Sequence, residues 1–78
     1  MITDATLRSE ILKALSNPFA GEQRASGLTE SVSLSLRNYG LQVRRIGRIA
    51  NEMANEGLIR VRTAPGYFVD TAIFSAAK

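Results

Sequence analysis

Arginine is the residue type that most clearly indicates a function in this 78-residue sequence, and it is distributed unevenly along the chain. Six arginines lie between residues 37 and 62, where only Glu52 and Glu56 oppose them, so this segment carries a net charge of +4. The rest of the chain holds four basic and five acidic residues, which sum to −1 and leave a total of +3. The planar guanidinium group suits phosphate oxygens and guanine edges better than the ammonium group of lysine does. The pattern indicates a polyanionic partner, with a basic face that contacts only solvent as the alternative.

Most familiar enzyme chemistries are excluded by the residue types that are missing. Without cysteine or histidine, the chain has no thiolate or imidazole metal ligand, no cysteine nucleophile and no triad with a histidine base. Glu52 and Glu56 have the spacing of a carboxylate metal pair, but no third ligand is near in sequence and arginines flank them. The sequence also lacks a glycine-rich phosphate loop. We therefore expect no enzymatic activity, no metal site, no cofactor and no small-molecule ligand.

The arginine-rich segment contains the clearest predicted helix, residues 42–56, which follows Gly40 and ends before Gly57. At about 100° per residue, apolar and small side chains cluster around the direction of Val43, and polar side chains take the opposite side. The apolar group is Ile46, Gly47, Ala50, Met53 and Ala54, with Ile49 at its margin. The polar group is Arg44, Arg45, Arg48, Asn51, Glu52 and Asn55. We expect the apolar stripe to cover a core and the arginine stripe to point away from it.

A first helix is predicted over residues 4–16. Thr3 can cap it, and Asp4 suits the positive end of the helix dipole. Its apolar positions recur at helical spacing, at Leu7, Ile11, Ala14 and Leu15. Pro18 disfavours helical backbone at residue 17, and the small and polar residues 18–27 are predicted to form a loop with room for one short strand near Arg24.

Residues 28–39 fit two different periods. The apolar residues Val32, Leu34 and Leu36 alternate with serines, which indicates a half-buried strand. A helix over 29–39 is indicated by one apolar face, formed by Leu28, Val32, Leu36 and Tyr39. Thr29 suits the cap of that helix and Glu30 its first turn. We favour the helix, which leaves Leu34 exposed, and the strand remains the alternative.

A hairpin is predicted after Gly57, with strands over 58–63 and 67–74 joined through Pro65-Gly66. We prefer the register in which Arg60 faces Asp70 and Val61 faces Val69, because charge then meets charge and apolar meets apolar. In the alternative register, Val61 faces Asp70.

This order of elements resembles the winged helix-turn-helix DNA-binding family. The resemblance covers residues 28–74 and is most specific at Tyr39-Gly40-Leu41-Gln42-Val43-Arg44-Arg45-Ile46 and at Met53-Ala54-Asn55-Glu56-Gly57-Leu58-Ile59. It implies a single α+β domain over residues 1–78, a winged helix of three helices with a C-terminal two-stranded hairpin as the wing.

The resemblance also implies a binding site for double-stranded DNA. The helix over 42–56 would enter the major groove, and the side chains expected to reach base edges are Gln42, Arg44, Arg45 and Arg48, with Asn51 on a base or a phosphate. The hairpin would lie on the adjacent backbone or minor groove through Arg62, Thr63 and Tyr67. Thr29 would contact phosphate, because free backbone donors cluster at a helix start. With about four phosphates neutralised, log affinity should fall against log salt with a slope near −3.6.

The expected function is that of a small prokaryotic, phage or plasmid transcriptional regulator that binds a specific DNA sequence in the cytoplasm. No apolar run is long enough for a membrane span or a signal peptide. A homodimer is possible through the first helix or the last strand, with Leu12 and Leu34 as exposed anchors. The alternatives are a winged-helix module that docks on an acidic protein, and non-specific binding to single strands or RNA.

Overall fold

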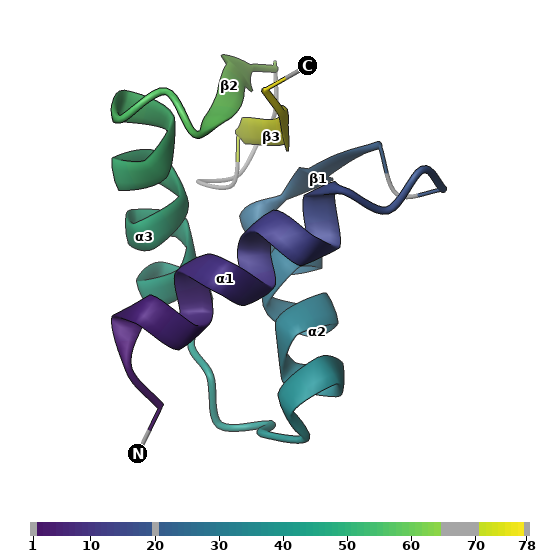
Figure 1. Ribbon diagram of the computed structural model, residues 1–78, viewed down its shortest axis with the longest axis vertical. Coiled ribbons are helices and arrows are strands. Elements are labelled where there is room, and N and C mark those ends of the chain that lie inside the picture. Colours follow the sequence, from purple (N-terminus) through teal and green to yellow (C-terminus); the bar gives the residue numbers. More distant parts are fainter. Residues whose placement is uncertain (1, 20, 65–70, 78) are drawn as a thin grey trace.

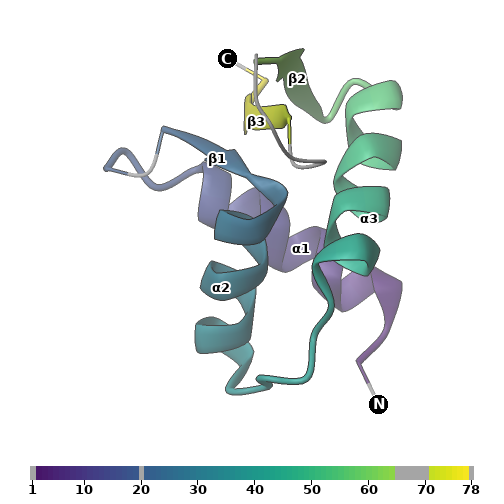
Figure 2. The same cartoon turned by 180° about the vertical axis from the view of Figure 1, so that it is seen from behind.

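Three helices and a three-stranded antiparallel sheet form the part of the chain that the structure describes. The computed structural model describes residues 2–19, 21–64 and 71–77. The elements follow one another as α1 (Asp4–Leu15), β1 (Glu22–Arg24), α2 (Ala25–Leu36), α3 (Val43–Asn55), β2 (Ile59–Thr63) and β3 (Ala72–Ala76). The strand order is β1-β3-β2, and α1 lies across α2 and α3, with the sheet at the end where α3 finishes (Figure 1 and Figure 2). The predicted α+β class is therefore confirmed.

Helix α1 begins and ends close to the predicted 4–16. Thr3 is its N-cap, and its hydroxyl oxygen accepts a hydrogen bond of 3.2 Å from the amide of Thr6, as the sequence predicted. The buried residues Leu7, Ile11 and Leu15 lie on one face and join the core. None of the helices in the described ranges combines the length and the apolar character that crossing a bilayer requires.

Helix α2 resolves the ambiguity of residues 31–36, which are helical, but its predicted bounds of 29–39 are wrong. The helix starts at Ala25, directly after β1, without a hydrogen bond from a capping side chain. The sequence did not predict this start because burial, and not a capping side chain, stabilises it: Leu28 is fully buried and Ala25 is almost fully buried. The helix ends three residues early because Arg37 adopts the left-handed conformation, with φ at 53°. Leu34 is exposed as expected, and Tyr39, which the helical face had placed towards the core, is 73% exposed.

Helix α3 agrees closely with the predicted 42–56 and ends as the sequence indicated. Gly57 follows the C-cap residue Glu56 with φ at +81°, a value that glycine adopts without a side-chain clash. The amide of Gly57 donates to the carbonyl of Ala54, and the amide of Leu58 donates to the carbonyl of Met53. These two bonds form a Schellman motif, which turns the chain from α3 into β2.

The hairpin has a different register from the predicted one. Val61 pairs with Phe74 and Arg60 with Ser75, so the predicted pairs of Arg60 with Asp70 and Val61 with Val69 are wrong. The second strand covers 72–76 in place of 67–74, and residues 67–70 lie outside the described residues. Burial explains the shift: Phe74 is 1% exposed, and burying a phenylalanine contributes about 1.5–3 kcal/mol. An exposed ion pair contributes only about 0–1 kcal/mol, so the aromatic side chain decides the register.

The core is one apolar cluster to which every helix and two of the strands contribute. It consists of Leu7, Ile11, Leu15, Ala25, Leu28, Val32, Ile46, Ile49, Ala50, Met53, Ile59 and Phe74. Helix α3 thus has one side held in the core by four buried residues and another side turned outwards. The fold fixes the direction in which its arginines point.

Candidate nucleic-acid interface

The outward side of α3 is rotated from the one predicted. The buried residues of this helix are Ile46, Ile49, Ala50 and Met53, so Ile49 belongs to the centre of the buried stripe and not to its margin. Val43, around which the apolar stripe was drawn, is 43% exposed. Since the buried stripe lies closer to Ile49, the face that remains free carries apolar and small side chains as well as polar ones.

A groove runs beside this free face of α3. From α3 it is lined by Val43, Arg44, Gly47, Arg48 and Asn51, and its other described lining residues are Ala25, Ala72 and Phe74. Its volume is about 530 Å³. The groove therefore has apolar walls from α2 and β3 and a polar edge from α3. We call the set Val43, Arg44, Gly47, Arg48 and Asn51 the outer face of α3.

Arg44 is the arginine of the outer face with the greatest freedom to bind an external group. It is exposed, and among the described residues it has no ion-pair or hydrogen-bond partner. Gln42, the N-cap of α3, and Asn51 are exposed as well, and their side chains form no hydrogen bond within the described ranges. All three side chains were predicted as site residues, and the fold leaves them accessible from outside.

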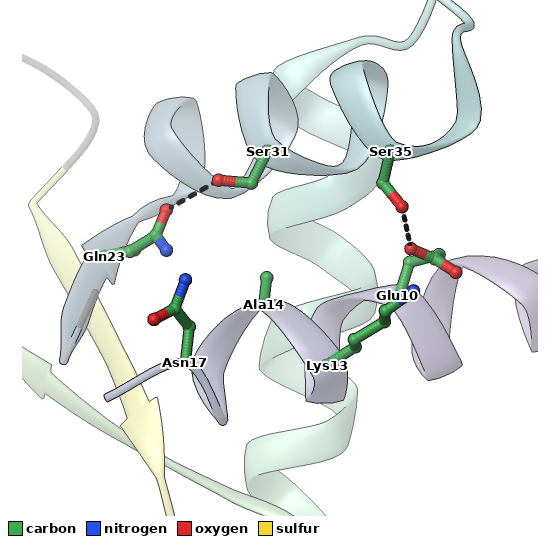
Figure 3. A pocket seen from close by; sticks show the side chains of 7 residues that line it. All are labelled: Glu10, Lys13, Ala14, Asn17, Gln23, Ser31 and Ser35. Carbon is green, nitrogen blue, oxygen red and sulfur yellow. Dashed lines mark hydrogen bonds between the residues drawn. The ribbon is translucent and has the colours of Figure 1, made fainter. Parts of the chain in front are cut away.

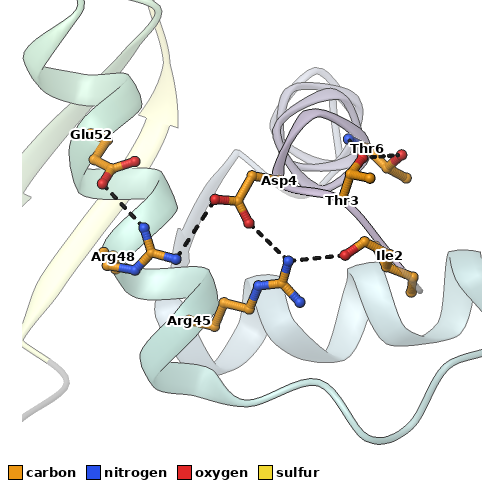
Figure 4. Close-up of polar contacts among 7 residues, drawn as sticks. All are labelled: Ile2, Thr3, Asp4, Thr6, Arg45, Arg48 and Glu52. Atoms are coloured by element: carbon orange, nitrogen blue, oxygen red, sulfur yellow. Dashed lines mark hydrogen bonds and ion pairs between the residues drawn. The ribbon is translucent and has the colours of Figure 1, made fainter.

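Arg45 and Arg48 are held by carboxylates (Figure 4). The pair of Arg48 with Glu52 has the i,i+4 spacing of an ordinary helical ion pair, whereas the contacts with Asp4 had no signal in the sequence. Arg45 donates one hydrogen bond of 2.8 Å to Asp4 and another of 3.0 Å to the carbonyl of Ile2. Arg48 lies 3.2 Å from a carboxylate oxygen of Glu52 and 3.8 Å from one of Asp4. The hydrogen bond from Arg45, with smaller help from the charges of Arg45, Arg48 and Arg8, holds the pKa of Asp4 below its ordinary value. Arg45 thus points towards α1 and away from the groove.

The predicted hairpin contacts are only partly available for binding. Arg62 reaches across the central strand β3 and forms two hydrogen bonds of 2.9 Å with Glu22 on β1. These bonds lower the pKa of Glu22 and raise that of Arg62. Thr63 is exposed at the end of β2. Tyr67 lies outside the described residues.

The basis of the predicted phosphate contact at Thr29 is wrong, because the structure does not place this residue at a helix start. Thr29 lies within α2, four residues after the helix begins, so free backbone amides do not surround it. Its side chain is 7% exposed, and its hydroxyl donates a 2.7 Å hydrogen bond to the carbonyl of Ala25. The residue was misassigned because the start of α2 carries no capping signal in the sequence.

A second, polar cleft of about 240 Å³ separates α1 from α2 (Figure 3). Its hydroxyls have internal partners: Ser35 donates to Glu10 at 2.6 Å, and Ser31 donates to Gln23 at 3.3 Å. Glu52 and Glu56, the pair with metal-ligand spacing, are bound to Arg48 and Arg8 respectively. Within the described part of the chain, no group of three or more acidic residues could hold a metal ion. The outer face of α3 is therefore the stronger candidate site.

Sequence reasoning missed the two carboxylates that hold predicted site arginines, Asp4 and Glu22. Asp4 was noticed only as a helix-dipole residue, and Glu22 lies in a segment predicted as a loop. Asp4 lies 41 residues from Arg45 in the sequence, and Glu22 lies 40 residues from Arg62, so no local spacing could have revealed the pairs.

Comparisons with models of protein families, with curated proteins and with solved structures found no match.

Proposed function

We propose that this protein binds double-stranded DNA as a winged helix-turn-helix domain, with α3 in the major groove. The observation that carries the proposal is the outer face of α3, where Arg44 and Asn51 are accessible and have no described side-chain partner. A guanidinium group can bind both acceptors of guanine, and a carboxamide can pair with adenine in the same manner. The two side chains offer the donors and acceptors that reading base edges requires.

The dimensions of α3 support insertion into DNA. Thirteen helical residues are about 20 Å long, and the major groove is about 12 Å wide, which admits a helix. Because Gln42 stands at the N-terminal end of α3, it can reach a base beside those contacted by Arg44.

The order of elements supports the same proposal. Two helices precede α3, and the antiparallel pair β2 and β3 follows it, as in the winged-helix plan that the sequence resembles. Arg60 and Thr63 on β2 are exposed and would supply the contacts of the wing to the DNA backbone. On this proposal the protein is a small transcriptional regulator in a prokaryotic or infected cell, where cytoplasm and DNA share one compartment.

The proposal is tested with the full chain and duplex DNA. Sequences selected from a random duplex pool supply the preferred site, and fluorescence anisotropy then measures its dissociation constant over a series of salt concentrations. Arg44→Ala should weaken binding to that site by about 5-fold to 150-fold, the range given by losing one bidentate base contact. Lys13→Ala is the matched control, because it removes the same charge from the cleft between α1 and α2. Screening should limit the loss from Lys13→Ala to about twofold at physiological salt.

Two results would overturn the proposal. One is that the wild-type chain binds neither random nor selected duplexes at low salt. The other is that Arg44→Ala and Lys13→Ala weaken binding equally, since the contribution of Arg44 would then be only its net charge.

A further inference from the structure

The N-terminal turn of α1 is fastened to the first half of α3 by charge. A single nitrogen of Arg45 donates to the Asp4 carboxylate at 2.8 Å and to the Ile2 carbonyl at 3.0 Å. The second oxygen of Asp4 lies 3.8 Å from Arg48, and Glu52 holds Arg48 from its other side at 3.2 Å (Figure 4). We call Asp4, Arg45, Arg48 and Glu52 the carboxylate clamp.

The clamp changes which positive charges α3 offers to an external anion. The first half of α3 carries three arginines, Arg44, Arg45 and Arg48. Asp4 pairs with Arg45, and Glu52 pairs with Arg48. Only Arg44 is left without a described partner. The charge of the helix that is free to bind is therefore concentrated beside Asn51 and Gly47 on the groove.

Asp4 is suited to compete with a phosphate group for these arginines. Its side chain is 52% exposed, so the pairs it makes are accessible to an incoming anion. It lies in the first turn of α1, where the positive end of the helix dipole favours a negative charge. An exposed ion pair is weak. DNA that makes base contacts as well as phosphate contacts with α3 can therefore displace Asp4 from the arginines. DNA that makes phosphate contacts alone gains less binding free energy from displacing it.

We propose that Asp4 is a specificity-determining residue of the α3 interface, because it reduces sequence-independent phosphate binding by Arg45 and Arg48. This inference rests on the proposed function. Phosphate contacts contribute to the affinity for every DNA sequence, whereas base contacts distinguish one sequence from another. A carboxylate that opposes the phosphate contacts lowers the affinity for random DNA more than the affinity for the preferred site. Asp4 acts through the two arginines and is a positioning residue, with no contact of its own to DNA.

The test compares Asp4→Asn with Glu30→Gln in the full chain. Both variants raise the net charge by one unit, but Glu30 is exposed on α2 and stands outside the carboxylate clamp. Random duplex and the selected duplex are titrated by fluorescence anisotropy over a salt series, and circular dichroism confirms that each variant is folded.

Asp4→Asn should raise the affinity for random duplex by about threefold to tenfold, because two weak competing pairs are lost. Its log–log salt slope should steepen by about 0.9 for each arginine that gains a phosphate. The ratio of specific to random affinity should fall, and Asp4→Glu should restore it in part. Glu30→Gln should change the random affinity by less than about twofold, because distant charges are screened.

The inference and the proposed function fail by different results. If the wild-type chain binds DNA and Asp4→Asn has the same salt slope and specificity ratio as Glu30→Gln, the role of Asp4 is wrong and DNA binding stands. If neither wild type nor Asp4→Asn binds duplex DNA at low salt, the proposed function itself is wrong.

Discussion

Two glycine-to-alanine substitutions, one inside α3 and one just after its C-terminal end, should change the stability of the protein in opposite directions. Gly47 lies inside α3, where alanine is favoured over glycine by about 0.5–1 kcal/mol. A Cβ atom at this position would meet the Cβ of Ala25 on α2 at 3.4 Å, which is the short limit of ordinary van der Waals contact. The crossing of α2 and α3 therefore has room for the methyl group, and Gly47→Ala should stabilise the protein by about 0.5–1 kcal/mol.

Gly57→Ala is the matched comparison. A Cβ atom there would meet nothing within 4 Å, so packing is not disturbed, but φ is +81°. The left-handed conformation costs an L-residue about 1–2 kcal/mol, which should appear as lost stability. For a chain of this size, a change of 1 kcal/mol moves the midpoint of thermal unfolding by about 4–8 °C.

Thermal and urea unfolding followed by circular dichroism would measure both changes. The expected result is a higher midpoint for Gly47→Ala and a lower one for Gly57→Ala. Equal losses in the two variants would refute the reasoning, because they would mean that α2 and α3 pack too closely at Gly47 to accept a methyl group.

Two further predictions concern charge and the core. The pKa values of Asp4 and Glu22 are lowered by hydrogen bonds from arginine, so the unfolded chain binds more protons in acid and stability is lost as the pH falls through the folded-state values. Urea midpoints should therefore fall less between about pH 6 and pH 3 in Arg62→Ala than in wild type, and a steeper fall in the variant would contradict the pairing with Glu22. Phe74→Ala should cost about 3–5 kcal/mol of unfolding free energy, whereas Val61→Ala, at the paired position in β2, should cost about 1 kcal/mol because Val61 is 43% exposed. Similar losses at the two positions in urea unfolding would argue against the observed register.

Elements with a strong local signal were predicted well. Helix α1 has a capping threonine and regular apolar spacing, and α3 has a glycine at its C-terminal end, so both lie within a residue or two of their predicted bounds. Helix α2 lacks a capping side chain and begins at a position that only burial supports. The predicted start of α2 is four residues late, so Thr29 was expected at the N-terminal end of the helix, whereas it lies in the interior.

The sequence placed the predicted site residues of α3 on a helix face, but it did not show which of them a distant side chain holds. Arg44 and Asn51 are exposed, as the helical wheel suggested, because one turn of sequence suffices to place a side chain on a face. The wheel also assigned Arg45 to the free stripe, yet Arg45 points towards Asp4 on α1. A wheel describes one helix and carries no information about what a distant helix brings beside it.

The sequence by itself determined the chemistry this protein can perform: no thiol or imidazole reactions, and a cluster of guanidinium groups on an amphipathic helix. It determined α1, α3 and the turn at Gly57 as well, because these depend on contacts within a few residues. Only the tertiary structure decided the register of β2 with β3, the start of α2, the pairing of Arg45 and Arg62, and the second contact of Arg48, with Asp4. The physical reason is the range of the interactions. The burial of Phe74 and the pairing of Asp4 with Arg45 or of Glu22 with Arg62 join residues far apart in the chain, and their geometry exists only once the core has formed.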